Sequence, residues 1–203
     1  MPELLTPFWL LGLVGLAAYM LGSVPFGVVV ARVMGLGDLR AIGSGNIGAT
    51  NVMRTGNKLA GALTLALDAG KGAVAALIAW VAIGEDAAQA AALAAFLGHL
   101  YPVYLGFKGG KGVATFIGTA FALAWPVALA ICAIWAVVFK LSRYSSLSAL
   151  IASALSPALA LAFGHGSMAA LFAALTLMIF YKHSGNIRRL LAGTEPKFER
   201  KRP

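Results

Sequence analysis

Long stretches without a charged residue are the feature that most limits how this 203-residue chain can fold. A helix needs about 20 apolar residues, roughly 30 Å, to cross a lipid bilayer. The stretches that meet this length are residues 4–31, 59–84 (broken by one acid and one lysine), 87–107, 112–139 and 144–181. Only 11% of the residues are charged, against about 25% in soluble domains. The composition therefore excludes a soluble globule, a disordered tail and a fibrous repeat.

The number of membrane crossings depends on the two longest stretches. Residues 144–181 are too long for one crossing, and Gly164-His-Gly166 indicates a turn between two helices. Residues 112–139 form either one tilted helix or two short helices of about 20 Å each that break at Trp125-Pro126. The second arrangement is favoured because it places the basic residues, Lys71 excepted, on one side of the membrane.

The charges also orient the chain. Glu3 precedes the first stretch, which lacks the basic segment of a signal peptide, so we expect the N-terminus outside. Glu85 and Asp86 then fall outside as well, and most Lys and Arg residues fall on the cytoplasmic side with the C-terminus. We predict one all-α domain over residues 1–203, a polytopic integral membrane bundle of about seven transmembrane helices. The stretches lack the alternation of a membrane β-barrel.

The first cytoplasmic loop, residues 35–58, is rich in glycine and in neutral donors. Glycine lets main-chain N–H groups turn toward an anion, and Ser, Thr and Asn add side-chain donors. Residues 43–48 match Gly-x-Gly-x-x-Gly, but no strand precedes them, so a dinucleotide site is excluded. A phosphate site and a flexible connection both remain open, although a flexible connection does not account for Arg54.

The second cytoplasmic loop, Lys108-Gly-Gly-Lys-Gly112, opens a helix. Free N–H groups at the start of a helix favour anions, and Lys111 can reach the same anion. The loop resembles a P-loop only loosely, because Gly112 stands where a P-loop has Ser or Thr. A simple basic hairpin is the alternative.

Two further cytoplasmic segments carry polar side chains. One contains Ser145, Ser146 and Ser148; in the other, His183 and Asn186 share a helical face if the last helix continues. Arg189 follows one turn later, and Glu195 can orient a nearby cation. For the remaining basic residues we favour contact with lipid headgroups. These are Arg188, Arg200, Lys201 and Arg202.

Asp68 and Lys71 lie three residues apart within a predicted membrane helix, where isolated charges are costly, so we expect them to pair. We favour a structural role for this pair, and the alternative is that the pair lines the bottom of a polar site. For His99 we favour a packing role. A His-x-x-x-x-Asp acyltransferase dyad is absent from the sequence, as are Gly-x-Ser-x-Gly and any acidic cluster able to hold two Mg²⁺ ions. Cys132 has no second cysteine to pair with, which excludes a disulfide framework.

Together these segments resemble the bacterial acyl-phosphate:glycerol-3-phosphate acyltransferases. The matching motifs are Gly43-Ser-Gly-Asn-Ile-Gly-Ala-Thr-Asn51 with Arg54, Gly98-His-Leu-Tyr-Pro102 with Lys108-Gly-Gly-Lys-Gly112, and His183-x-x-Asn186-Ile-x-Arg189-Leu-x-x-Gly193-x-Glu195. The resemblance covers essentially the whole chain, including Gly22-Ser-x-Pro25-Phe-Gly27.

The resemblance implies transfer of a fatty acyl group from acyl phosphate to the 1-hydroxyl of sn-glycerol 3-phosphate. The products are lysophosphatidic acid and phosphate, in the first step of phospholipid biosynthesis. It also implies the bacterial plasma (inner) membrane, an active site at its cytoplasmic face and a functional link to an acyl-phosphate synthase. We expect contacts with membrane lipid and neither a cofactor, a metal nor a nucleic acid. A transporter of a phosphorylated solute and a non-catalytic bundle that binds anionic lipid are the alternatives.

The predicted site residues lie in these motifs, except Ser146, which is chosen from the serines at 145, 146 and 148 with the choice among them left open. Catalytic roles are predicted for Ser44, Lys111, His183 and Asn186, with His183 or a substrate phosphate as the base. Substrate binding is predicted for Gly43, Ser44, Gly45, Asn46, Gly48, Thr50, Asn51, Arg54, Lys108, Gly109, Gly110, Lys111, Gly112, Ser146, Asn186, Arg189 and Glu195.

Overall fold

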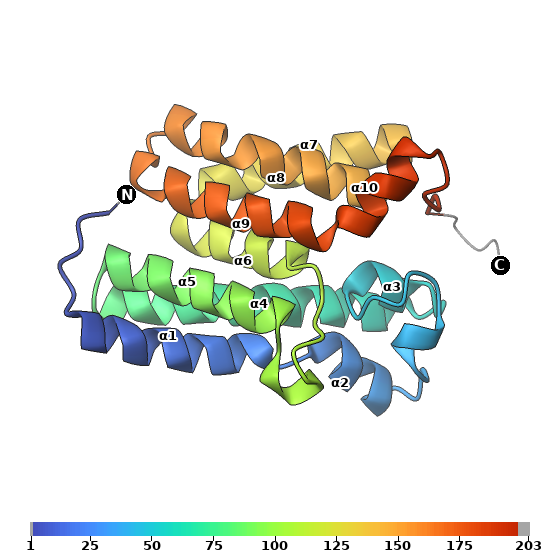
Figure 1. Ribbon diagram of the computed structural model, residues 1–203, viewed down its shortest axis with the longest axis horizontal. Helices are drawn as coiled ribbons and strands as arrows, with labels where there is room; N and C mark the ends of the chain where they lie inside the picture. The colour runs from blue at the N-terminus through green and yellow to red at the C-terminus, as the bar shows by residue number, and fades with distance from the viewer. Residues whose placement is uncertain (1, 199–203) are drawn as a thin grey trace. The chain divides into compact units, whose positions relative to one another are not determined.

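The computed structural model describes residues 2–198, and this part of the chain is helical without a β-strand (Figure 1). The all-α prediction is confirmed. The helices group into two compact units, residues 2–123 and residues 124–198. The assignment of residues 1–203 to one domain stays a prediction.

The first unit is built around three long helices that lie side by side, α1, α4 and α5. Shorter helices α2 and α3 lie near the start of α4, at one end of this unit (Figure 1). The helices are α1 (Phe8–Ser23), α2 (Phe26–Val33), α3 (Ala49–Met53), α4 (Lys58–Ala82), α5 (Glu85–Leu100) and α6 (Val113–Leu123), with 3₁₀ turns at Leu39–Ala41 and Val103–Leu105.

Glycines allow these helices to pack with their backbones nearly in contact. A Cβ at Gly22 of α1 would overlap the main chain of Ala95 in α5, and a Cβ at Gly118 of α6 would overlap the carbonyl of Ala69 in α4. Small residues at such positions are what membrane helices use to approach closely. The glycine and alanine content of the sequence therefore serves helix packing in this unit.

Charged groups lie at opposite ends of the first unit. At the end where α5 begins, Asp86 accepts hydrogen bonds from the amides of Leu5 and Thr6 at 3.0 and 2.7 Å. At the other end, Arg40 donates from Nη2 to the carbonyl of Lys108 at 2.7 Å. Asp86 and the Arg40–Lys108 contact thus lie at opposite ends of this unit, and the orientation of the chain in the membrane stays a prediction.

The second unit consists of α7 (Trp125–Ser142), α8 (Ser145–Ala162), α9 (Ala169–Lys182) and α10 (Ser184–Leu191), with a 3₁₀ turn at Gly166–Met168. The predicted turn near Gly164 is confirmed, since α8 and α9 flank it. The stretch 112–139 is two helices, which meet at Ala124. The expectation that both are short is wrong for α7, whose 18 residues extend about 27 Å, and holds for the 11-residue α6.

Pro157 lies inside α8 and leaves the carbonyl of Ser153 without its helical N–H donor. Thr176 of α9 donates from Oγ1 to this carbonyl at 2.7 Å, and Ser156 donates to it from its own helix at 2.7 Å. Neighbouring hydroxyls are one of the means by which membrane proteins satisfy a backbone group that proline has freed. The proline therefore also fixes a polar contact between α8 and α9.

Within residues 2–198, five helical segments are long and apolar enough to cross a membrane. They are Phe8–Val33, Lys58–Ala82, Glu85–Leu105, Trp125–Ser142 and Ser145–Ala162. The segment formed by α9 and α10, which is bent by 64° where they meet, adds a sixth if it counts as one span. Seven crossings would require the short helix α6 as well, so that number stays a prediction.

Candidate active site

The first cluster of predicted residues lies in the loop of the first unit that leads into α3, and Asn51 organises it. The Asn51 side chain is 2% exposed. Its Oδ1 accepts from the Ser44 amide at 3.0 Å and lies 3.4 Å from both Ser44 Oγ and Arg54 Nη1. Its Nδ2 donates to the carbonyl of Leu39 at 2.8 Å. Asn51 thus holds a hydroxyl and a guanidinium beside each other.

Gly43 is required for this arrangement. Its φ of +52° favours glycine, and a Cβ there would lie 2.7 Å from Arg54 Cδ. Gly45 also has a positive φ, and its amide donates to the carbonyl of Ile42 at 2.9 Å. The loop glycines therefore give the compact turn that brings Ser44 to Asn51 and Arg54.

The other predicted residues of this loop surround the start of α3. Gly48 is the residue before α3, and Thr50 lies in its first turn. Asn46 is half-buried, with its Nδ2 3.3 Å from where a Cβ of Gly48 would stand. These residues are sequence neighbours of the Asn51 cluster.

The second loop, residues 108–112, is held against the end of α5. The amide of Gly109 donates to the carbonyl of Leu100 at 3.2 Å, and the amide of Gly110 donates to the carbonyl of His99 at 3.1 Å. A Cβ at Gly112, whose φ is +85°, would overlap the ring of Phe96. The amide of Lys108 also donates to the carbonyl of Leu105 at 3.3 Å, so three of the loop amides are used inside the chain, and α6 begins directly after the loop.

The two lysines of this loop differ in exposure. Lys108 is exposed and its carbonyl accepts the hydrogen bond from Arg40, whereas Lys111 is half-buried. Arg40 was not among the predicted residues, because its role depends on a backbone oxygen far away in the sequence. Its hydrogen bond joins the two loops within the first unit.

Below the second loop lie the buried charges of α4. Lys71 Nζ is 2.8 Å from Asp68 Oδ1 and donates to the carbonyl of Val24 at 2.8 Å. The predicted pairing of Asp68 with Lys71 is therefore confirmed. His99 Nδ1 lies 3.6 Å from the same carboxylate oxygen, a neighbour that the sequence spacing did not reveal.

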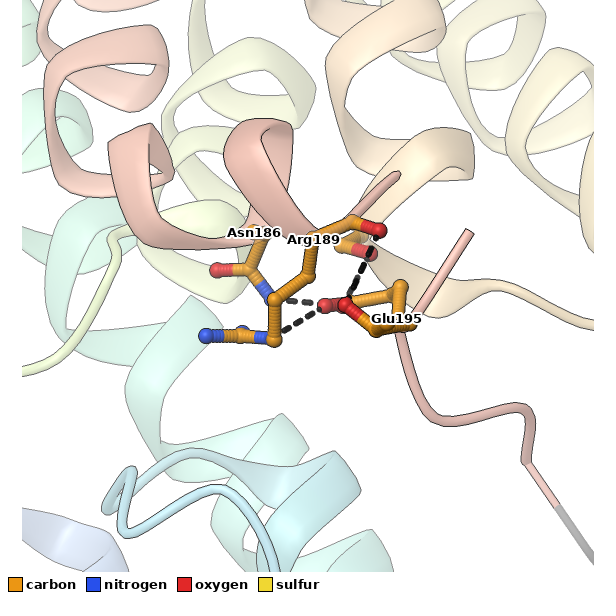
Figure 2. Close-up of polar contacts among 5 residues, drawn as sticks. Asn186, Arg189 and Glu195 are labelled. Carbon is orange, nitrogen blue, oxygen red and sulfur yellow. Dashed lines mark hydrogen bonds and ion pairs between the residues drawn. The ribbon is translucent and has the colours of Figure 1, made fainter. Parts of the chain in front are cut away.

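The second cluster lies in the second unit and is centred on Glu195. Figure 2 shows Asn186 and Arg189, both on α10, directed at the carboxylate of Glu195. Asn186 Nδ2 donates at 2.6 Å and Arg189 Nε at 2.8 Å. Ser146 Oγ, from the start of α8, donates to the same carboxylate at 2.6 Å. The segment after α10 is thereby tied to α8 and α10.

The protonation state of Glu195 follows from these contacts. Burial acts to raise the pKa of its carboxyl, and the hydrogen bonds from Ser146, Asn186 and Arg189 lower it more strongly. The net pKa lies below the usual value for glutamate, so the group is ionised at neutral pH. Charge-assisted hydrogen bonds of this kind are stronger than neutral ones, which makes Glu195 the anchor of the cluster.

Two serines at the start of α8 have different hydrogen-bond partners. Ser146 is buried against Glu195, while Ser148 donates to the carbonyl of Tyr144 at 2.8 Å. Ser146 is therefore the serine of this segment that joins the second cluster. Of the basic tail, Arg188 is exposed on α10, and Arg200, Lys201 and Arg202 lie outside the described residues.

His183 occupies the bend between α9 and α10, so the last helix does not continue straight through it. Its side chain is 3% exposed, and its Nδ1 lies 2.8 Å from the carbonyl oxygen of Ile179. A carbonyl oxygen only accepts, so Nδ1 carries the proton in this contact. In the neutral form of the ring, Nε2 is then the nitrogen that accepts a proton, as a general base requires.

Comparison with known proteins identifies the family. Residues 12–193 match the family described as glycerol-3-phosphate acyltransferase. The chain belongs to this family. It is 62% identical over 196 residues to the glycerol-3-phosphate acyltransferase of Jannaschia sp. (strain CCS1), covering 97% of each protein. It is 59% identical over 201 residues to that of Cereibacter sphaeroides (strain ATCC 17025 / ATH 2.4.3), covering 99% of this chain and 96% of that protein.

Solved structures of glycerol 3-phosphate acyltransferases also resemble this chain. The crystal structure of PlsY (YgiH), an integral membrane glycerol 3-phosphate acyltransferase in its glycerol 3-phosphate form, matches with a TM-score of 0.88 and 41% identity. The match covers 93% of this chain and 96% of that one. The lysophosphatidic acid form of PlsY matches with a TM-score of 0.85 and 38% identity, over 93% and 95% of the two chains.

Proposed function

We propose that this protein transfers a fatty acyl group from acyl phosphate to the 1-hydroxyl of sn-glycerol 3-phosphate, giving lysophosphatidic acid and phosphate. The observation that carries the proposal is the similarity over nearly the whole chain to proteins named glycerol-3-phosphate acyltransferase. Related structures in glycerol 3-phosphate and lysophosphatidic acid forms support the same acceptor and product. The relatives favour this enzyme over a transporter of a phosphorylated solute.

The proposed acyl donor, acyl phosphate, requires of the enzyme only groups that bind and orient phosphates, which is what the polar residues of the two clusters can do. Acyl phosphate is a mixed anhydride, so the acceptor hydroxyl can attack its carbonyl carbon without a covalent enzyme intermediate. The bond to the phosphate oxygen then breaks and phosphate leaves. Binding and electrostatic stabilisation of phosphates and of the developing oxyanion can supply much of the rate enhancement.

In the first cluster, Ser44 and Arg54 are the proposed phosphate ligands. Asn51 supports them, because its oxygen and one of its N–H groups are used within the loop. In the second loop, the amides of Gly109 and Gly110 are already hydrogen-bonded. We place the anion-binding donors of that loop at Lys111, Gly112 and the first turn of α6, because N–H groups at the start of a helix favour anions.

In the second cluster, Glu195 changes the roles proposed for its neighbours. The hydroxyl of Ser146 and one N–H of Asn186 donate hydrogen bonds to Glu195. For a substrate phosphate we place the contacts at the Asn186 amide and at the outer nitrogens of Arg189, whose side chain is 42% exposed. Glu195 serves to orient them.

His183 is the proposed base for the acceptor hydroxyl, through Nε2, with a substrate phosphate as the alternative. His183→Ala lowers kcat by about two orders of magnitude or more if the histidine accepts the proton. Near-normal turnover of a folded His183→Ala protein would assign the proton to a substrate phosphate.

The membrane arrangement is also proposed. Seven crossings, with α6 as a short one and α9–α10 as a bent one, would place the N-terminus outside and the C-terminus in the cytoplasm. Support comes from the basic residues of the loops and from the positive-inside rule. Both clusters would then face the cytoplasm of a bacterial inner membrane, where an acyl-phosphate synthase would supply the donor.

The function is tested by phosphate release from the purified protein in lipid bicelles. Glycerol 3-phosphate is supplied with palmitoyl phosphate or, separately, with palmitoyl-CoA, and lysophosphatidic acid is measured in parallel. Turnover with palmitoyl phosphate that collapses in Lys111→Ala supports the proposal. Turnover with palmitoyl-CoA alone would contradict the donor, and no turnover with either would contradict the activity and direct attention to solute flux in liposomes.

A further inference from the structure

Three ionisable side chains are buried together beneath the loop 108–112, outside the residues assigned to substrate. Asp68, Lys71 and His99 are each at most 5% exposed. Asp68 lies within 2.8 Å of the Lys71 ammonium and 3.6 Å of the His99 ring. Burying charges costs free energy, and apolar side chains of similar volume often give equal or greater stability. Stability alone therefore does not account for this group.

His99 contacts the loop with both its backbone and its ring. Its carbonyl accepts the amide of Gly110 at 3.1 Å. A Cβ at Gly110 would overlap His99 Nε2 and would lie 3.0 Å from Cε1, so the imidazole is packed directly against this glycine. The orientation of the ring thus determines where the backbone of Gly110 can lie.

Asp68 contacts the structure on the other side of the same loop. Its main-chain oxygen accepts a hydrogen bond from Thr115 Oγ1 at 3.0 Å, in the first turn of α6. A Cβ at Gly72, one turn further along α4, would lie 2.8 Å from Thr115 Cγ2, so α6 is packed closely on α4 here. Asp68 is therefore linked to the loop through His99, which contacts Gly110, and to the start of α6 through Thr115.

We infer that Asp68 and His99 are positioning residues for the loop 108–112, holding the donors around Lys111 and Gly112 in the geometry that binds a substrate phosphate. Asp68 fixes the His99 ring, and the ring fixes the backbone of Gly110. Lys71 balances the charge of Asp68 and ties it to Val24, where α1 ends. The identity of the substrate in this inference rests on the proposed function. The binding of phosphate by the loop does not.

The test replaces His99 with side chains that fill the same space. His99→Met keeps the volume beneath Gly110 and removes the polar contact with Asp68, while the Asp68–Lys71 pair remains to support folding. His99→Gln restores a donor of similar reach. Gln89→Met is the matched control, because Gln89 lies on the same helix, is 7% exposed and donates to Glu85, at the far end of α5.

Two measurements are made on each folded variant in bicelles. The first is kcat and KM for glycerol 3-phosphate and for palmitoyl phosphate. His99→Met raises the KM of one of the two substrates at least tenfold and changes kcat less than threefold. His99→Gln returns that KM to within threefold of the wild type, and Gln89→Met leaves both KM values unchanged.

The second measurement does not depend on turnover. Amide hydrogen exchange of residues 106–116 is followed with and without inorganic phosphate, which slows exchange in the wild type and in His99→Gln but not in His99→Met. Equal KM values and equal phosphate protection in His99→Met and the wild type would overturn the inference. If the wild type shows protection but no acyl transfer, the proposed function fails while the loss of protection in His99→Met still supports the inference.

Discussion

Arg40 Nη2 donates a hydrogen bond to the main-chain oxygen of Lys108 at 2.7 Å, linking two loops that are 68 residues apart in the sequence. The contact is exposed, so its net contribution is modest. We predict that Arg40→Ala lowers kcat/KM for acyl transfer about threefold to tenfold, the range that corresponds to one hydrogen bond. Steady-state kinetics with palmitoyl phosphate measures this loss.

Arg32 supplies the matched control for Arg40. It is an exposed arginine of the same unit, at the end of α2. Arg32→Ala removes the same charge and should leave kcat/KM within twofold of the wild type. An equal loss in both variants would mean that the positive charge of this surface matters, and not the link between the loops.

The side chain of Asn51 joins the first loop to its own helix. Asn51→Leu leaves the carbonyl of Leu39 and the amide of Ser44 without their partners. We expect the free energy of unfolding to fall by about 1–3 kcal/mol and kcat/KM to fall at least tenfold. Thermal unfolding in detergent and steady-state kinetics measure the two effects.

A substitution of Asn57 is the control that distinguishes a loss of stability from a loss of activity in the Asn51→Leu experiment. It precedes α4 and caps it, with Oδ1 accepting from the amide of Ala60 at 3.0 Å. Asn57→Ala should cost about 1 kcal/mol of stability and leave kcat/KM nearly unchanged. If Asn57→Ala lowers activity as much as Asn51→Leu does, loss of stability explains both results.

Much of the fold could be predicted from the sequence because membrane helices satisfy their own backbones. The apolar stretches, the turn near Gly164 and the pairing of Asp68 with Lys71 follow from local length, glycine placement and spacing of three residues. The lengths of α6 and α7 were harder to predict, because an uncharged stretch contains no charged residue that indicates where one helix ends and the next begins. The break falls at Ala124, one residue before Trp125.

The sequence singled out the loops of the candidate site, but it did not reveal which side chains and backbone groups contact each other there. Ser44, Arg54 and Asn186 were chosen as donors by residue type, and the structure shows which acceptors already hold them. The roles of Arg40 and His99 depend on backbone oxygens and on a carboxylate from other helices. Such partners lie tens of residues away, beyond any spacing rule, so a sequence without its fold does not reveal them.

Glu195 makes the stability of the second unit depend on pH. Its folded-state pKa is lowered, so it contributes stability above the unfolded value of about 4.3, and this stability is lost as pH falls through the folded-state pKa. We predict that Glu195→Gln lowers the Tm at pH 7 and that its difference from the wild type shrinks below about pH 4. Thermal unfolding in detergent between pH 7 and pH 3.5 measures this difference.

The control for Glu195 is another glutamate-to-glutamine change. Glu3 is exposed, and Glu3→Gln should keep the Tm of the wild type throughout this pH range. A difference between Glu195→Gln and the wild type that stays constant down to pH 3.5 would contradict the charge-dependent role of Glu195.

The contact between Thr176 and the carbonyl of Ser153 is predicted to matter only because Pro157 frees that carbonyl. Thr176→Val should lower the free energy of unfolding by about 1 kcal/mol. In a Pro157→Ala background, the introduced alanine supplies the helical N–H, so the same change should cost less than half as much. Urea or thermal unfolding of the wild type, both single variants and the double variant gives the coupling energy directly. Additive effects would mean that Thr176 acts through packing against α8, because the loss of its hydrogen bond would then not depend on the proline.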